Sequence, residues 1–455
     1  MTKNLMLLEK QSQIKELGSD QNHLILNELI RSPLTCQQLA NVFSLPKQKI
    51  HYKLGKLLEE NLIEIAPDYN DNQKEVYYRA KAKNYVLAYT IGQNVADNIL
   101  NSREIISNIL EQQYKVSLQD IAAKLIDESL CLKARDKLMI VTGKYNLPLV
   151  DKILIEAGRR SIHCTIIYQD LDQLRAKYEE YSLTAFNDDY EMFNHQLSSQ
   201  TVYLNLNGEA RFLKLTDPQK VKLRQKHFAK SLQLIKKHGI RVAVMPGLLR
   251  DTLTDNTIDS ELQFWQALDI DYVQLREKTE TLCKGFEEKD ELEVCCGESC
   301  FSFQISRILA DTGSFSDSKY QIHTINLPGG EILLLPKPMS LYGKIMGSVA
   351  YIEGEKVLEP ELVLKDNEII SFKAATNEHL LAKAIAQGGP DSRKVALICL
   401  GTNENVKLEN IDESFRQKSL GLMTIYWGEN ISLGGSVSGA SEWFIQIENP
   451  LFKNK

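Results

Sequence analysis

The sequence predicts a mixed α/β protein in which a small helical N-terminal unit precedes a much larger α/β body. Three observations support this prediction. Short helical patterns followed by two strand patterns occupy residues 1–83. Buried strands then alternate with helices between about residues 133 and 275, an order typical of a parallel, doubly wound sheet. From about Leu292 onward, short strands separated by Gly, Asn and Asp turns predominate, which indicates a β-rich C-terminal part.

The length of 455 residues exceeds one ordinary core and predicts two or three domains. The changes in pattern place the boundaries between four segments. These are an N-terminal domain, a helical connector, an α/β subdomain and a β-rich subdomain, at residues 1–83, 84–117, 118–280 and 281–455.

Charge and cysteine content limit the possible partners and the compartment. With 54 Lys and Arg against 60 Asp and Glu the net charge is -6, so nucleic-acid binding would need a local basic patch. The chain has no apolar run of signal-peptide or membrane-spanning length, which predicts a cytoplasmic protein without membrane contact. Eight cysteines without a regular framework suit a reducing compartment, and we expect no disulfide.

Three helices with short turns are expected near the N-terminus. Residues 22–31 carry apolar side chains at helical spacing, and Ser32-Pro33-Leu34-Thr35 ends this helix and caps the next. A second short helix follows at residues 36–43, and a third begins near Lys47 after the turn that Pro46 favours.

The third helix has a basic face. The apolar residues Ile50, Leu54, Leu57 and Leu58 are expected to direct one side to the core. No acidic residue occurs between Lys47 and Glu59. Strands at residues 63–65 and 75–79 then form a hairpin wing, an order that predicts a DNA-binding winged helix-turn-helix. The side chains expected to contact DNA are Lys47, Lys49, His51, Tyr52, Lys53, Lys56 and Lys74.

Residues 20–82 resemble the ArsR-type winged helix. The resemblance rests on the stretch from Ile50 to Ile65 and on the closing Tyr77-Tyr78-Arg79. It implies binding to double-stranded DNA as a homodimer, because one such domain offers few phosphate contacts. Modules of this kind also bind peptides or only dimerise, so these two roles remain alternatives.

A long amphipathic helix is expected at residues 84–113, where isoleucines and valines recur without a proline. It would connect the two halves of the chain and could form a dimer seam, or it could pack on its own domain. Beyond it, strands at 138–141, 164–168, 201–204 and 241–245 carry the α/β pattern. No GxGxxG or Walker-type loop occurs, so nucleotide binding has no support and no cofactor is expected.

The segment Asn326-Leu327-Pro328-Gly329-Gly330-Glu331 resembles a signature of the metallo-aminopeptidases of the aminopeptidase T and S family. Further marks of that family follow in order at Leu400-Gly401-Thr402-Asn403 and Gly434-Gly435, so the resemblance covers residues 118–447. It implies an aminopeptidase-like fold. In that family, two metal ions held by carboxylates and histidines activate the water that hydrolyses the peptide bond.

The resemblance also implies that the metal site is degenerate. Glu331 keeps the signature carboxylate, but three further ligand positions fall on Leu397, Thr424 and Phe444. A leucine or phenylalanine cannot bind a divalent ion, so we expect neither a metal nor a catalytic residue. Glu442 is the other carboxylate near a ligand position.

The remaining concavity could hold a small amino-acid-like or peptide-like molecule. Its expected lining includes the aromatics Tyr426, Trp427, Trp443 and Phe444, for which core packing is the alternative. The residues expected to contact the ligand are Asn326, Glu331, Thr424, Tyr426 and Glu442. The Cys295-Cys296-Gly297-Glu298-Ser299-Cys300 segment is a possible metal or redox site, although it lacks the paired CxxC knuckles of a zinc site.

A DNA reader joined to a catalytically inactive enzyme fold predicts a transcriptional regulator that senses a small effector. Two alternatives stay open. One is an amide or peptide hydrolase or transferase with a rebuilt active site that uses Glu331 and Glu442. The other is a peptide-docking protein of a biosynthetic pathway, in which the wing edge binds the peptide.

Overall fold

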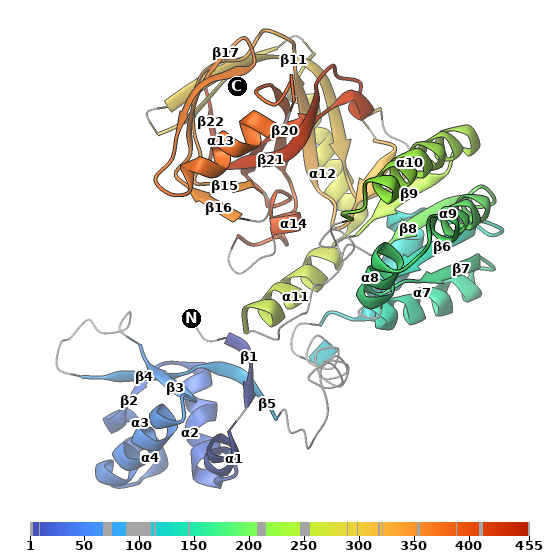
Figure 1. Cartoon of the computed structure of the whole chain (residues 1–455). Coiled ribbons are helices and arrows are strands. Elements are labelled where there is room, and N and C mark those ends of the chain that lie inside the picture. Colours follow the sequence, from blue (N-terminus) through green and yellow to red (C-terminus); the bar gives the residue numbers. More distant parts are fainter. Residues whose placement is uncertain are drawn as a thin grey trace. The chain divides into compact units, whose positions relative to one another are not determined.

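The computed structural model divides the chain into two compact units. Unit 1 comprises residues 1–109 and 250–262, and unit 2 comprises residues 110–249 and 263–455. Their elements are labelled in Figure 1. The residues that the structure describes are 3–8, 10–66, 75–87, 111–112, 115–143, 146–206, 215–245, 255–288, 290–297, 299–316, 319–320, 322–352, 355–387, 389–408 and 413–453.

Unit 1 contains four complete helices, the first part of a fifth at residues 255–262, and two small sheets among its described residues. Strand β2 pairs with β4, and β4 pairs with β3, in a three-stranded antiparallel sheet. The elements are β1 (Lys3–Leu8), α1 (Gln11–Leu17), α2 (Asp20–Arg31), β2 (Leu34–Thr35), α3 (Cys36–Phe43), α4 (Lys47–Glu59), β3 (Ile63–Ile65), β4 (Tyr77–Ala80) and β5 (Ala82–Leu87).

Local sequence explains where the helices of unit 1 begin and end. The Thr35 side chain accepts a hydrogen bond from the Gln38 amide, and the Gln38 side chain accepts one from the Thr35 amide, which caps α3. Ser44 ends that helix in a left-handed conformation. Ile50, Leu54 and Leu57 of α4 are buried in one cluster with apolar residues of α2 and α3, as expected. The expectation is wrong for Leu58, which is 39% exposed.

The prediction of a connector helix is wrong for its first residues. Residues 84–87 belong to strand β5, which pairs in parallel with β1. A partner strand from the very N-terminus satisfies the backbone groups of β5, and the apolar run Val86-Leu87 suits a strand as well as a helix. Residues 88–110, which form most of the predicted connector, lie outside the described residues.

Unit 2 begins with an α/β layer built on a five-stranded parallel sheet in the order β12-β9-β8-β6-β7. The predicted parallel sheet is thus confirmed, and its edge strand β12 comes from beyond residue 280. The elements are α6 (Leu118–Lys124), a π-helical turn (Leu125–Ser129), β6 (Lys137–Thr142), α7 (Leu147–Arg159), β7 (His163–Tyr168), α8 (Leu171–Glu179), α9 (Leu183–Leu197), β8 (Val202–Asn205), α10 (Pro218–His238), β9 (Arg241–Val244), α11 (Asp255–Leu268), α12 (Tyr272–Lys284) and β12 (Thr324–Asn326).

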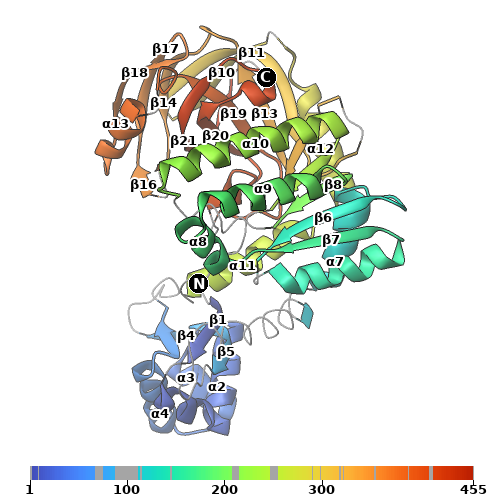
Figure 2. The same ribbon diagram turned by 45° about the vertical axis from the view of Figure 1, so that its right-hand side comes forward.

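The strand order also explains where the helices lie. The chain moves outward from β6 to the edge strand β7, then returns to β8 and β9 on the far side of β6. Right-handed crossovers therefore place α7 on one face of the sheet and α9 and α10 on the other, as Figure 2 shows.

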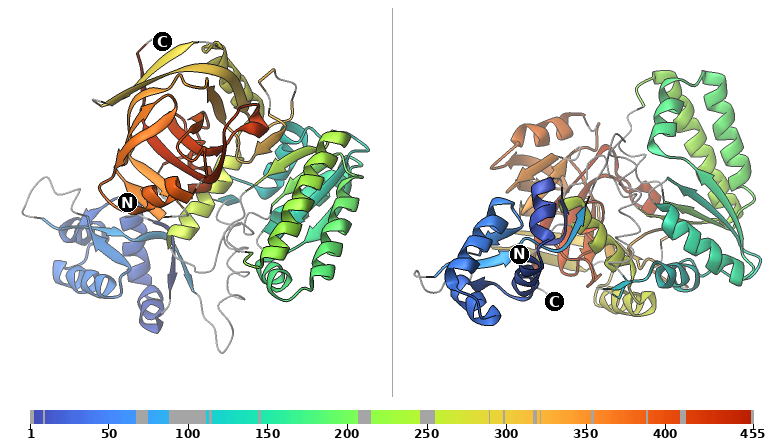
Figure 3. Two further views of the ribbon diagram at one scale, coloured as in Figure 1. Left: turned by 45° about the horizontal axis from the view of Figure 1, so that its top comes forward. Right: turned by 90° about the horizontal axis from the view of Figure 1, so that it is seen from below.

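A twelve-stranded sheet makes up the rest of unit 2 and curves into a half-barrel, visible in Figures 1 and 3. Its main path is β16-β15-β21-β20-β19-β13-β11-β14-β17-β18, and β10 pairs with β11 and β22. The elements are β10 (Glu291–Cys296), β11 (Ser299–Asp311), β13 (Glu331–Pro336), β14 (Tyr342–Met346), β15 (Val349–Ile352), β16 (Glu355–Leu358), β17 (Glu361–Lys365), β18 (Glu368–Lys373), α13 (Glu378–Gln387), β19 (Val395–Gly401), α14 (Glu413–Arg416), β20 (Leu422–Glu429), a 3-10 turn (Ile431–Leu433), β21 (Ser438–Glu448) and β22 (Leu451–Phe452).

Two further expectations can be compared with the structure. Cys295 and Cys300 form a disulfide, although no disulfide was expected. The β10–β11 hairpin pairs these two residues directly, with Cα atoms 4.1 Å apart, and the sequence pattern does not reveal that register. Within the described ranges, none of the helices combines the length and apolar character that a membrane span requires.

Candidate functional site

A buried cluster of three charged side chains lies where the signature glutamate Glu331 begins β13. Asp311 ends β11 directly opposite Glu331 in the antiparallel register. Lys418 reaches the two carboxylates from the loop between α14 and β20. The exposed fractions are 0% for Asp311, 6% for Glu331 and 1% for Lys418, so the cluster is almost sealed from water.

Lys418 bridges the two carboxylates. Its Nζ donates to Asp311 Oδ2 over 2.8 Å and to Glu331 Oε1 over 2.5 Å. Asp311 accepts three more hydrogen bonds, from the backbone amide and Nδ2 of Asn326 at Oδ2 and from the Gly313 amide at Oδ1. Both carboxyl oxygens of Asp311 are therefore surrounded by hydrogen-bond donors of the protein.

Glu331 has a different environment. Its Oε2 is buried and finds no hydrogen-bond partner among the described residues. Burial, and secondarily the neighbouring Asp311 charge, raise the pKa of Glu331, which the Lys418 ammonium opposes. The two carboxylates raise the pKa of Lys418 against the effect of its burial. The cluster combines two carboxyl groups with one ammonium group, so it is neutral when one of the two carboxyl groups carries a proton.

Glycine 401 makes room for the lysine. Gly401 lies opposite Glu331 in the pairing of β19 with β13. A Cβ at this position would lie 2.0 Å from the carbonyl oxygen of Ser419, so no larger residue fits without moving the loop. The close approach of this loop to β19 brings the neighbouring Lys418 over the sheet.

Polar residues of the central strands extend the site along the same sheet face. Cys399 pairs with Thr424, and Thr424 pairs with Gln446, across β19, β20 and β21. All three are buried, and burial raises the pKa of the Cys399 thiol well above its usual range. Thr424 Oγ1 and both amide atoms of Gln446 lack hydrogen-bond partners within the described chain.

The five residues predicted to contact a ligand have different environments. Asn326 and Glu331 are tied into the charged cluster, where each bonds to one of its members. Thr424 is fully buried within β20. Tyr426 is half-buried and Glu442 is exposed, and their interaction contributes to the raised pKa of Tyr426 after burial, Cys399 and Glu331.

The two tryptophans do not share this face. Trp427 and Trp443 stack with ring centroids 4.1 Å apart and are only 1% exposed, inside the largest apolar core of the β-rich layer. Strand alternation directs them to the face opposite Tyr426 and Phe444, whose rings pack at 5.3 Å. Core packing is therefore the correct interpretation for both tryptophans.

The side chains present do not fit a pair of catalytic metal ions. Leu397 pairs with Tyr426 and packs in a small apolar cluster, and Phe444 continues this apolar surface. The two available carboxylates are already bridged by an ammonium group, and no imidazole is among the residues of the cluster. A divalent ion would have to displace the Lys418 charge from a buried site.

Asp311 and Lys418 were not predicted from the sequence. Asp311 ends a strand just before a glycine-containing turn, Thr312-Gly313, and this position at the end of a buried strand is a weak signal. Lys418 lies in an ordinary polar loop and carries no comparable signal. Only the pairing of β11 with β13 and the loop over Gly401 bring these charges together.

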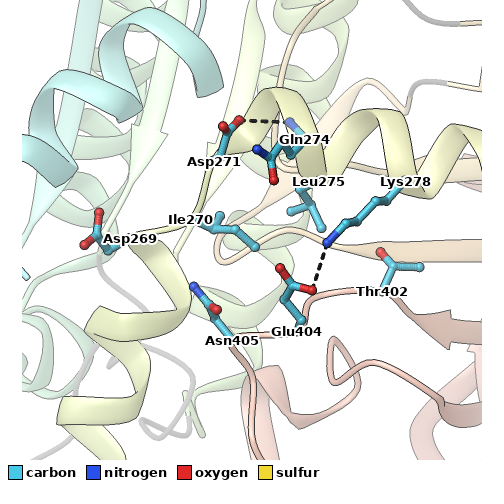
Figure 4. A pocket seen from close by; sticks show the side chains of 9 residues that line it. All are labelled: Asp269, Ile270, Asp271, Gln274, Leu275, Lys278, Thr402, Glu404 and Asn405. Carbon is cyan, nitrogen blue, oxygen red and sulfur yellow. Dashed lines mark hydrogen bonds and ion pairs between the residues drawn. The ribbon is translucent and has the colours of Figure 1, made fainter. Parts of the chain in front are cut away.

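A pocket lies between the start of α12 and the loop that follows β19, as Figure 4 shows. Lys278 of α12 donates to Glu404 over 2.8 Å across it, and Asp271 caps the start of α12. Thr402 connects it to the charged cluster, because its amide donates to the Gly330 carbonyl beside Glu331. The pocket is lined by Asp269, Ile270, Asp271, Gln274, Leu275, Lys278, Thr402, Glu404 and Asn405.

The side chains of helix α4 in unit 1 that were predicted to contact DNA differ in their exposure to solvent. Lys47, Lys49, His51 and Tyr52 are exposed, and Tyr52 has an exposed fraction of 67%. Lys53 is half-buried and donates to Asn22 Oδ1 over 3.0 Å. Lys56, also half-buried, pairs with Glu59. Lys74 lies outside the described residues.

Comparisons with known proteins agree with the expected fold of the body. AmpT from Thermus thermophilus aligns with 73% of this chain and 92% of its own at 15% identity, with a TM-score of 0.55. The 2,5-dihydroxypyridine dioxygenase of Pseudomonas putida KT2440 aligns with 74% of this chain and 93% of its own at 12% identity, with a TM-score of 0.50. The body therefore has an aminopeptidase-like fold, and fold similarity alone does not assign an activity.

A third structure, NolR from Sinorhizobium fredii, aligns with 21% of this chain and 80% of its own at 19% identity. Its TM-score of 0.14 is too low to support a statement about fold. No protein-family model and no curated protein sequence matches this chain.

Proposed function

We propose that this chain is a DNA-binding transcriptional regulator whose aminopeptidase-like body senses a small amino-acid-like or peptide-like effector and no longer hydrolyses peptides. The exposed basic face of α4 is the observation that carries the proposal. In it, helices α2 to α4 and strands β3 and β4 work as a winged helix-turn-helix, and two chains bind double-stranded DNA together.

The distribution of side chains on α4 supports the DNA-binding part. Ile50, Leu54 and Leu57 of α4 are buried, whereas Lys47 and Lys49 of the same helix are exposed to solvent. A helix anchored on one side and cationic on the other suits insertion into the major groove, where lysines reach phosphates and base edges. The net charge of the whole chain is -6, so this local face would supply the attraction.

The buried lysine supports the loss of hydrolysis. Two-metal hydrolysis needs carboxylates that are free to bind cations and a water that reaches them. Asp311 and Glu331 instead share the Lys418 ammonium in a nearly sealed cluster. The predicted alternative of a rebuilt hydrolase that uses Glu331 would require this cluster to open.

The pocket of Figure 4 is the proposed effector site. Its cavity volume is about 120 Å³ and it opens to solvent, so it could receive a small polar group such as the charged end of an amino-acid-like ligand. Lys278 offers a cation for a carboxylate, and Asp271 and Glu404 offer anions for an ammonium group. The alternative location for the effector site is around Tyr426 and Glu442, which the sequence predicted to contact the ligand.

Fluorescence anisotropy with DNA from upstream of the chain's own gene tests the proposal. The double variant Lys47→Ala, Lys49→Ala should bind more weakly, and the slope of log affinity against log salt should flatten by about two. The matched control removes two exposed charges from the region of α1, Lys10→Ala with Lys15→Ala, and should change affinity little. Equal affinity of wild type and the α4 variant would contradict the DNA-binding proposal.

Effector sensing has its own test. Amino acids and dipeptides would be titrated into the protein–DNA complex. An effector changes DNA affinity only if it binds the DNA-binding conformation and the other conformation of the protein with different affinities. Lys278→Ala should abolish the response if the pocket of Figure 4 is the site, and Glu442→Gln should abolish it if the alternative location is. A response retained in both variants would contradict both locations.

A further inference from the structure

The hairpin of β10 and β11 brings three metal-binding side chains to one face. Cys295 and Cys300 are directly paired across the two strands. Glu293 precedes Cys295 by two residues on β10, so strand alternation places its carboxylate on the same face. The ligand atoms of these three residues all lie within 4.8 Å of one another.

We propose that the reduced hairpin binds a soft divalent cation, with Zn²⁺ as the best match, through Cys295 Sγ, Cys300 Sγ and a Glu293 carboxylate oxygen. Oxidation to the Cys295–Cys300 disulfide, the state seen in the structure, closes the site. The site belongs neither to the charged cluster around Lys418 nor to the proposed effector pocket.

The donor set determines the choice of metal. Two thiolates favour zinc over magnesium or calcium, which prefer oxygen ligands, and Zn²⁺ accepts carboxylate oxygen as a further ligand. Three protein ligands leave one tetrahedral position for water. Cys300 is partly exposed, so an ion from solvent can reach the sulfur pair.

Neighbouring residues define the limits of the site. Cys296 lies next to Cys295 but points to the opposite face, where it packs against the large apolar core. It therefore cannot join the cluster and serves as an internal control. Lys453 of the C-terminal segment donates to Glu293 Oε1 over 2.9 Å, so a bound dication would have to displace this ammonium.

The redox chemistry balances with simple reagents. Two thiol molecules, which are oxidised to a disulfide, or one phosphine, which is oxidised with water to its oxide, supply the two electrons and two protons that convert the S–S bond into two thiols. Zinc binding then releases these two protons as the thiolates coordinate the metal. A low-molecular-weight disulfide reverses the process: it oxidises the pair, is itself reduced to two thiols, and the zinc leaves.

Zinc titration of the full-length protein tests the inference. The protein would be reduced with a phosphine, freed of reductant, and titrated with Zn²⁺ in competition with a chromophoric chelator. Reduced wild type should hold one zinc ion more than the double variant Cys295→Ser, Cys300→Ser. Oxidised wild type should lack the same ion, which is a control that needs no substitution.

Single substitutions then assign the ligands. Glu293→Gln should weaken zinc binding by about tenfold or more, Lys453→Ala should strengthen it, and Cys296→Ser should leave it unchanged. The inference fails if the reduced wild type holds no more zinc than the double variant, or if Cys296→Ser removes the ion as effectively. Zinc binding that is insensitive to oxidation would also overturn it.

Discussion

Lys418 Nζ donates a 2.8 Å hydrogen bond to Asp311 Oδ2, and both side chains are enclosed by the body of unit 2. Asp311 ends a strand of the half-barrel and Lys418 comes from a loop more than one hundred residues later, with a sequence separation of 107. The bond places a fixed positive charge between two buried carboxylates. This relationship leads to the first three predictions.

Removing the lysine should destabilise the protein strongly. Lys418→Ala leaves Asp311 as an uncompensated buried charge, and breaking such a pair typically costs about 3–5 kcal/mol of the free energy of unfolding. Urea unfolding, followed by circular dichroism, measures the loss. The matched control is Lys278→Ala, whose ion pair with Glu404 is exposed, and it should change the unfolding midpoint little. Similar losses in both variants would contradict a special role for the buried pair.

Protonation of Glu331 should make stability depend on pH. Because its pKa is raised in the folded state, the folded protein binds a proton more readily than the unfolded chain. The stabilisation is fully present below the ordinary pKa of a glutamate and is lost as pH rises through the raised value. Glu331→Gln removes this titration, so its stability relative to wild type should increase with pH. Urea unfolding at several pH values checks this, and a pH-independent difference would refute it.

The wild-type protein should not hydrolyse amino-acid amides or dipeptides above background in the presence of cobalt or zinc, because Lys418 occupies the space between the carboxylates. Lys418→Ala opens a site that contains Asp311, Glu331 and the Cys399 thiol, and we expect it to bind Co²⁺ with a thiolate absorption band. That band should disappear in Lys418→Ala, Cys399→Ser. Turnover by wild type that is lost in Glu331→Ala would show instead that the hydrolytic site is intact.

Two lysines of α4 should behave differently when replaced by alanine. Lys53 holds Asn22 through a 3.0 Å hydrogen bond, so Lys53→Ala should lower the stability of unit 1 by about 1 kcal/mol. Lys49 is exposed, so Lys49→Ala should lower DNA affinity without changing stability. Thermal unfolding and anisotropy on the same preparations separate the two effects. A stability loss in Lys49→Ala equal to that in Lys53→Ala would contradict this division.

The stacked tryptophans should matter for stability and not for ligand binding. Trp443→Ala opens a cavity in the main core and should cost about 3–5 kcal/mol. Tyr426→Phe keeps the ring on the opposite face and should cost much less. Urea unfolding of both variants tests this, and the reverse order would contradict the assignment of Trp443 to the core.

Local patterns of the sequence were sufficient for many elements. Helices α2 and α3 begin and end, and α4 begins, within two residues of the expected positions, since caps such as Thr35 and turns such as Pro46 act over a few residues. Helix α1 was not predicted. The alternation of strands and helices, which is also visible in the local sequence pattern, predicted the parallel sheet. The strand at residues 84–87 was missed because its partner β1 lies some eighty residues away, and local apolar spacing cannot distinguish the two outcomes.

The candidate site shows the same division. The sequence by itself determined that Glu331 keeps a carboxylate while Leu397 and Phe444 cannot bind metal, because these properties belong to the side chains. Only the tertiary structure decided that Asp311 and Lys418 complete a buried cluster of charged side chains with Glu331, and that Cys295 faces Cys300. Long-range strand register and the close approach at Gly401 set these distances, and neither is encoded in the spacing of residues along one segment.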